Sequence, residues 1–333
     1  MTTKATFYTG SYYCNNRQFD IDDPVANRDN CLYPLYLLKQ KFAEYDVDLS
    51  TQDINKPKDS DFIIYNEMPR RYRISPKKQN YLLIFESKLI RPQNWNIRNH
   101  RFFKKIFTWD DDFVDGEKYF KINFSHQVPS SLPSIGINDK KLCTLIAANK
   151  VYHRPNELYS ERVNAIRWFE GNHPQDFDLY GQGWDLRFYS GILGHLNCIM
   201  PLRRIRPPTF SSYRGPIKDK LSVLKNYKFS ICYENLKNTK GYITEKIFDC
   251  FFAGCVPVYW GAPNITDHIP PDTFIDRRKF STYNEIYEFM TDLPDEKYAQ
   301  YLSAIRNFLQ SEKMDQFTAE KFADTIIKEI ISE

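Results

Sequence analysis

The chain has 333 residues, more than one hydrophobic core usually serves, so two domains are expected. It is 42% hydrophobic and 26% charged with a negative mean hydropathy, which excludes a disordered or membrane-embedded protein. A formal net charge of +4 is too small for a nucleic-acid-binding footprint. No apolar run of roughly eighteen residues occurs, and the N-terminus lacks the regions of a signal peptide, so we expect a soluble, cytoplasmic protein.

The first half of the chain shows short apolar runs alternating with helical patterns, which predicts an α/β architecture. Buried parallel strands are predicted at 4–9, 61–65 and 81–85, with an amphipathic helix at 35–45. The segment 128–140 contains two prolines and three serines without apolar periodicity, and is predicted to be a linker.

The second half repeats this alternation. Strands are predicted at 142–147, 177–181, 227–233 and 256–260, and helices at 159–170, 244–253 and 319–331. Gly254 should end the second of these helices. We therefore expect a first domain over 1–135, a second over 136–310 and a C-terminal helix in 311–333, whose packing against the first domain the sequence leaves open.

Cysteine usage indicates the redox state of the chain. The seven cysteines form no Cys-x-x-Cys pair, and an odd number in a chain of this length does not suit a disulfide framework. Most stand among apolar neighbours, where a thiol behaves as a small hydrophobe. We expect reduced core residues at Cys14, Cys31, Cys143, Cys198, Cys232, Cys250 and Cys255.

The stretch 227–276 carries the chemical signal. It is predicted to form strand, polar loop, helix and strand, an order that puts the loop at the carboxyl edge of a parallel sheet. Thr244 can cap the helix, with Glu245 and Lys246 in its first turn. A lysine is unfavourable at this positively polarised end, which indicates a bound anion such as a diphosphate. Taken alone, an exposed lysine and an ordinary first-turn acid are the plainer interpretation.

The same stretch resembles the signature of the α-1,3-fucosyltransferases, inverting enzymes of the GT-B architecture that use GDP-fucose. The resemblance implies two Rossmann-like, doubly wound α/β domains that face a cleft, the first binding the acceptor and the second GDP-fucose. Its elements are Ser160 to Val163, Asp178 to Gly181, Tyr227-Lys228-Phe229, Glu234-Asn235, Tyr242 to Lys246, Val256-Pro257-Val258 and Gly261.

The resemblance also implies donor contacts. Arg162 and Lys246 would hold the diphosphate, and their charge would suit a departing GDP. Glu245 would accept hydrogen bonds from sugar hydroxyls, whereas Asn235 and Tyr242 would border the guanosine. Without the resemblance, Arg162 would be a solvated helix residue, and Asn235 and Tyr242 ordinary turn and loop residues.

A general base is implied by Phe85-Glu86-Ser87, which resembles the family's Glu-Ser-Pro element although Lys88 replaces the proline. The base must lie within hydrogen-bond reach of the acceptor hydroxyl, at the end of a strand. Glu67 follows another predicted strand and meets the same topological condition. We favour Glu86, with a solvated strand-end acid as the plain alternative for either residue.

Neither a metal nor another cofactor is expected to be required. The Asp-x-Asp pairs do not adjoin the donor signature, and the six histidines show no ligand spacing. GDP-fucose is the expected donor substrate, with a divalent cation as an optional stimulant. A basic run from Arg203 to Arg206 is interpreted as a solvated loop.

The sequence thus predicts an enzyme that moves L-fucose from GDP-β-L-fucose to a hydroxyl, O3 of GlcNAc in a glycan acceptor, giving an α-1,3-fucoside with inversion. Neither nucleic acid nor a membrane span is expected. The alternatives are a GT-B transferase using another nucleotide sugar and a non-catalytic glycan-binding protein, against which the intact Arg162, Glu245 and Lys246 argue. Lewis-type and core-chitobiose acceptors, α-1,4 linkage and oligomeric state stay open.

Overall fold

The computed structural model describes residues 2–70, 73–131, 139–189, 191–205 and 207–331. The chain divides into two compact units. Unit 1 comprises Met1–Val128, Lys240–Tyr242 and Glu312–Glu333, and unit 2 comprises Pro129–Thr239 and Ile243–Ser311. The predicted domain boundary at 135/136 lies outside the described residues. Within the described ranges, no helix combines the length and apolarity needed to cross a membrane.

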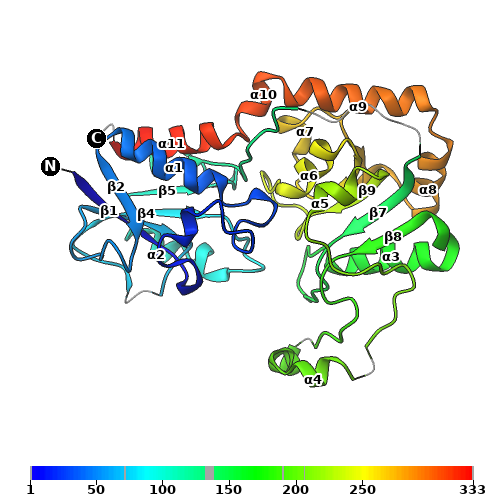
Figure 1. Cartoon of the computed structure of the whole chain (residues 1–333), viewed down its shortest axis with the longest axis horizontal. Coiled ribbons are helices and arrows are strands. Elements are labelled where there is room, and N and C mark those ends of the chain that lie inside the picture. Colours follow the sequence, from blue (N-terminus) through cyan, green and yellow to red (C-terminus); the bar gives the residue numbers. More distant parts are fainter. Residues whose placement is uncertain (1, 71–72, 132–138, 190, 206, 332–333) are drawn as a thin grey trace. The chain divides into compact units, whose positions relative to one another are not determined.

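Unit 1 is built on a six-stranded parallel sheet with the order β2-β1-β3-β4-β5-β6 (Figure 1). The central strands β3 and β4 are almost continuously buried, because the sheet is covered on both faces. The strands are β1 (Thr3–Tyr8), β2 (Val47–Thr51), β3 (Phe62–Asn66), β4 (Gln79–Ile84), β5 (Lys105–Thr108) and β6 (Tyr119–Lys121). The helices are α1 (Tyr33–Glu44), α2 (Ile97–His100), α10 (Glu312–Asp315), α11 (Ala319–Ile331) and the short 3₁₀ turns η1 (Ser11–Tyr13), η2 (Arg17–Phe19), η3 (Arg28–Asn30) and η5 (Pro92–Trp95).

The C-terminal helix α11 lies beside α1 in unit 1 (Figure 1). Its apolar stripe includes Phe322 and Ile326, which share one buried cluster with Leu38 and Phe42 of α1 and with Phe7 of β1. The helix therefore completes the core of the unit that contains the N-terminal strands.

Unit 2 is built on a five-stranded parallel sheet with the order β11-β10-β9-β7-β8. The helix after β9 ends where Gly254 takes a left-handed conformation with φ of +65°. The strands are β7 (Lys141–Ile146), β8 (Phe177–Tyr180), β9 (Tyr227–Tyr233), β10 (Val256–Trp260) and β11 (Ile275–Asp276). The helices are α3 (Tyr159–Asn172), α4 (Met200–Arg203), α5 (Lys220–Leu224), α6 (Glu245–Ala253), α7 (Ile265–His268), α8 (Tyr283–Asp292), α9 (Asp295–Leu309), η6 (Pro174–Asp176), η7 (Gly191–Cys198) and η8 (Arg277–Lys279).

Both sheets have the same winding. The strand order reverses between β1 and β3 in unit 1 and between β7 and β9 in unit 2. In doubly wound folds, ligands bind beyond the carboxyl ends of the strands at such a reversal. The predicted α/β class with two Rossmann-like sheets is confirmed, and the fold directs attention to the residues that follow β3, β4 and β9.

The cysteines are free, but not all of them are core residues. Cys143, Cys232, Cys250 and Cys255 are buried, as their apolar neighbours predict. The expectation is wrong for two others, because Cys31, which directly follows η3, and Cys198, the last residue of η7, are exposed.

The turn after β8 provides a test of the fold. Gly181 has φ of +128°, and an added Cβ would lie 1.9 Å from the carbonyl oxygen of Ala147. Gly181→Ala should lower the free energy of unfolding by about 3 kcal/mol or more, because backbone atoms cannot yield. Gly171→Ala in α3 is the control, since its Cβ meets nothing within 4 Å and alanine favours a helix by up to about 1 kcal/mol. Equal urea midpoints for the two variants would contradict this account.

Candidate active site

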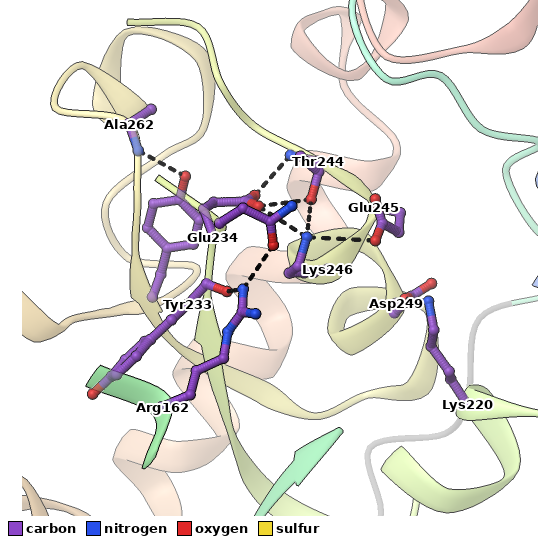
Figure 2. A network of polar contacts seen from close by, with 11 residues as sticks. Arg162, Lys220, Tyr233, Glu234, Thr244, Glu245, Lys246, Asp249 and Ala262 are labelled. Carbon is purple, nitrogen blue, oxygen red and sulfur yellow. Dashed lines mark hydrogen bonds and ion pairs between the residues drawn. The ribbon is translucent and has the colours of Figure 1, made fainter. Parts of the chain in front are cut away.

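A buried carboxylate stands at the carboxyl end of β9. Glu234 is fully buried, and its amide donates to the carbonyl of Trp260, so that pairing with β10 continues past the strand. Its Oε1 accepts from the amide of Thr244 at 2.8 Å, and its Oε2 accepts from the Thr244 hydroxyl at 2.8 Å and from Lys246 Nζ at 3.1 Å (Figure 2). One side chain thereby fixes the end of β9 to the start of α6.

The start of α6 is built around a cation. Thr244 occupies the predicted N-cap position, but its side chain makes no cap bond to the helix amides; its hydroxyl donates to Glu234 and accepts from Lys246. Lys246 Nζ donates to Thr244 Oγ1 at 2.8 Å and lies 3.5 Å from a carboxylate oxygen of Glu245. An ammonium at a positively polarised helix end is unfavourable, and the buried Glu234 offsets it. The Lys246 side chain keeps 23% exposure, so a ligand can reach it.

Gly261 leaves the space that the side chains of Glu234 and Tyr259 occupy. A Cβ on Gly261, just after β10, would lie 2.4 Å from the Tyr259 hydroxyl and 2.5 Å from Glu234 Cγ. The Tyr259 hydroxyl in turn accepts from the amide of Ala262 at 3.1 Å (Figure 2). The chain can therefore pass this close to Glu234 only where no side chain is present.

Arg162 approaches the same strand end from α3. Its Nη2 donates to the carbonyl of Tyr233 at 2.6 Å and to Asn235 Oδ1 at 3.0 Å, and its guanidinium carbon lies 4.7 Å from the centroid of the Tyr159 ring. The side chain is 5% exposed, so the interpretation of Arg162 as a solvated helix residue is wrong. Because a buried guanidinium needs partners, these contacts fix its direction. The structure thus brings Arg162, Asn235 and Lys246 to one sheet edge of unit 2.

Tyr242 belongs to unit 1, although its neighbours in the signature belong to unit 2. Its ring is 2% exposed and lies 4.7 Å from the ring of Trp109 and 6.0 Å from that of Phe124. Gly241, with φ of +72°, makes the fit possible, since a Cβ there would lie 2.3 Å from the Trp109 carbonyl. The expected contact of Tyr242 with guanosine stays a prediction.

Two carboxylates with different surroundings follow neighbouring strands of unit 1. Glu86 lies just after β4 and is exposed, whereas Glu67 follows β3 and is 8% exposed. Glu67 Oε1 accepts from the amides of Phe85 at 2.9 Å and Glu86 at 2.8 Å. Its Oε2 accepts from Asn94, which also donates to the Glu86 carbonyl at 3.1 Å. Glu67 therefore positions the backbone of Glu86, and Glu86 presents the accessible carboxylate.

The surroundings of Glu67 also change the pKa of its carboxyl group. Burial raises the pKa of Glu67 to about 7, although the hydrogen bonds from Asn94, Glu86 and Phe85 lower it. Asn94 is held in the donating orientation because its Oδ1 accepts from the amide of Met68 at 2.9 Å. Sequence reasoning considered Glu67 only as a base and gave Glu234 no role. The one available signal was that each follows a strand directly.

The raised pKa of Glu67 makes stability depend on pH. A native carboxyl with a pKa of about 7 against an ordinary 4.5 holds its proton more tightly than the unfolded chain does. Stability should therefore fall as pH rises from about 5 to 8, by roughly 2–3 kcal/mol from this group. Glu67→Gln should lack that component, so the free energy of unfolding of the wild-type protein should fall relative to that of the variant by this amount over the same pH range. Parallel profiles would show that Glu67 is not the responsible group.

Solved structures of other proteins have a similar fold. The fold matches a crystal structure of α1,3-fucosyltransferase with GDP-fucose at a TM-score of 0.54 and 15% identity, over 99% of this chain and 90% of that one. It also matches α-glucosyltransferase in complex with UDP and a 13-mer DNA at a TM-score of 0.59 and 10% identity, over 100% of both chains. The chain is therefore a GT-B-type protein with two parallel-sheet α/β domains.

The sequence comparisons are more specific. Residues 205–327 match the model of glycosyltransferase family 10 (fucosyltransferase), C-terminal part. Curated relatives include α-(1,3)-fucosyltransferase of Helicobacter pylori, 35% identical over 83 residues (25% of this chain, 17% of that one), and α-(1,4)-fucosyltransferase of Arabidopsis thaliana, 36% identical over 80 residues (23% and 20%). Over residues 205–327 the chain is similar to the fucosyltransferase family, which confirms the resemblance that the sequence motifs indicate. It spans only about a fifth of these relatives' lengths.

The residues that the structure describes include no group of acidic, thiol and imidazole side chains suited to a metal ion. Throughout the part of the chain that the structure describes, no three or more His, Cys, Asp or Glu residues are grouped so as to hold a metal ion. The charged groups at the end of β9 are instead paired cations and carboxylates of the chain itself.

Proposed function

We propose that this protein transfers L-fucose from GDP-β-L-fucose to a hydroxyl of a glycan acceptor, O3 of GlcNAc, with inversion to give an α-1,3-fucoside. The main support for this proposal is that Arg162 and Lys246 are held at the end of β9, where α6 begins without a side-chain cap. The donor is supported by the match of residues 205–327 to the fucosyltransferase family model and by the GDP-fucose named for the structural relative. Acceptor, linkage and a cytoplasmic location remain part of the proposal.

The proposed donor site accounts for departure of GDP. Negative charge develops on the diphosphate as the bond to fucose breaks, and fixed cations with a helix N-terminus stabilise it. Arg162 and Lys246 supply those cations. Glu245, 43% exposed, is the more accessible of the two acids beside Lys246 and would accept hydrogen bonds from the sugar. Asn235, aligned by Arg162, would border the guanosine together with Tyr242. No step in this scheme requires a metal, and a divalent cation would act only as a stimulant.

Glu86 is the proposed general base. In its ionised form it would remove the proton from the acceptor hydroxyl as that oxygen attacks the anomeric carbon from the face opposite GDP. Its backbone is fixed by Glu67 and Asn94, so the carboxylate does not depend on a flexible loop for its position. Lys88, which stands in place of the family's proline, leaves this hydrogen-bonded course intact.

Replacement of the base tests the catalytic half of the proposal. Glu86→Gln should lower turnover by ~10²–10⁴, because the amide cannot accept the proton, while GDP binding persists. Transfer of labelled fucose from GDP-fucose to a glycan panel measures this, with UDP-glucose as the competing donor. Glu117→Gln, another exposed acid of unit 1, is the control. Near-normal turnover by Glu86→Gln would remove Glu86 from the mechanism, and transfer from UDP-glucose alone would replace the donor.

Replacement of the helix-end cation tests the donor site. Lys246→Ala should weaken GDP binding by about 1.5–3 kcal/mol, the range for a hydrogen bond to a charged group. Lys228→Ala is a matched control, because Lys228 lies at the opposite end of β9, is 28% exposed and is also paired with a carboxylate. Calorimetry with both variants gives the comparison. Equal GDP affinities would contradict the proposed contact.

A further inference from the structure

A basic segment of unit 2 has no part in the proposed reaction. The sequence between residues 186 and 218 contains six arginines and lysines and no aspartate or glutamate, whereas the rest of the chain has two more acidic than basic residues. The positive net charge of the protein therefore resides in this segment. Within it, η7 and α4 lie on a long excursion of the chain between β8 and α5, and Figure 1 shows α4 well away from the strands of its own unit.

The described residues of the excursion are joined to one another by hydrogen bonds. Its two arms are joined where the amide of Arg187 donates to the carbonyl of Arg203 at 2.7 Å and Arg203 Nε donates back to the Arg187 carbonyl at 3.1 Å. Farther out, Asn197 and Tyr189 exchange hydrogen bonds of 2.9 and 2.7 Å. The Tyr189 hydroxyl also donates to the carbonyl of Leu202 at 3.1 Å. The side chains beyond this brace are therefore presented by a defined backbone.

Large apolar side chains are exposed at short intervals along this element. Four of the eleven most exposed large hydrophobic residues in the described chain fall within thirteen positions, each between 44% and 53% exposed. We call these residues the apolar tip: Leu193, Ile199, Met200 and Ile205. Arg204 is exposed beside them, and Arg203 is partly exposed. Single exposed apolar residues need no explanation, but four within thirteen positions of a stretch that has basic and no acidic residues indicate a binding surface.

We propose that the apolar tip docks this protein on the surface of an anionic lipid bilayer. Burial of aliphatic side chains at the boundary between headgroups and acyl chains is favourable, and neighbouring arginines are attracted electrostatically to lipid phosphates. The absence of acidic residues over this long stretch matches a negatively charged layer. Phosphates of a nucleic acid and hydroxyls of a glycan would leave the four aliphatic side chains in water, so they fit less well. The inference is independent of the proposed transferase activity.

Vesicle sedimentation of the full chain tests the proposal. The probes are large unilamellar vesicles of phosphatidylcholine alone and of phosphatidylcholine with about 30% phosphatidylglycerol. The protein should partition about tenfold or more in favour of the anionic vesicles, and the preference should weaken with added salt as the charges are screened. Ile199→Ser with Met200→Ser should lower partitioning to anionic vesicles by about tenfold or more. Arg204→Ser should lower it by a smaller factor.

The matched control replaces two exposed apolar residues of unit 1. Val25→Ser with Ile54→Ser removes side chains that are 71% and 49% exposed and should leave partitioning unchanged. Thermal unfolding midpoints of all variants check that each has folded. The proposal is overturned if the wild-type protein stays in the supernatant, if both vesicle types bind equally, or if the control variant loses as much binding as the tip variant. Concentration-dependent dimers that the tip variant alone abolishes, without vesicle binding, would assign the surface to a second copy of the chain.

Discussion

The carboxylate of Glu234 is the contact that organises the end of β9 and the start of α6, where the donor site is proposed. A carboxylate without solvent exposure is costly unless its oxygens are occupied, and here one amide, one hydroxyl and one ammonium occupy them. These donors come from the N-terminal end of α6, so the helix can begin only where Glu234 allows. The same carboxylate offsets the charge of Lys246 at an end that would otherwise repel it. The absence of a side chain at Gly261 follows from the space that Glu234 occupies.

A second buried carboxylate has a similar arrangement in unit 1. Glu67 follows β3 and accepts hydrogen bonds from the backbone just beyond β4, and Glu234 follows β9 and accepts them from the start of α6. In each case an exposed acid lies beside the buried one, Glu86 in unit 1 and Glu245 in unit 2. The buried acids hold backbone, and the exposed acids are the ones assigned to substrate in the proposed reaction. This division explains why residue type and position after a strand do not by themselves identify a base.

Charge is also distributed unevenly along the chain. The cations at the end of β9 are paired with carboxylates or carbonyl oxygens, so they add little to the field far from the site. The net positive charge comes instead from the acid-free stretch between β8 and α5. Ion pairs and hydrogen bonds within the chain therefore hold the cations at the end of β9, whereas the acid-free stretch combines a net positive charge with exposed apolar residues. The whole-chain value of +4 conceals this difference.

The sequence alone determined the elements whose apolar pattern is long or continuous. The strands at 227–233 and 256–260 and the helix at 319–331 have the predicted bounds, because their residues are buried in a regular period. It did not reveal β2, β5, β6 and β11, which are short or mixed with polar residues and become strands only by pairing with neighbours. The stretch 227–276, which carries most of the family signature, lies within the residues that match the fucosyltransferase family model. Only the tertiary structure brought Arg162 to Asn235 across 73 positions, placed Tyr242 in unit 1 and separated the holding role of Glu67 from the exposed Glu86. Long-range hydrogen bonds and the burial of single polar side chains decide those properties, and local periodicity encodes neither.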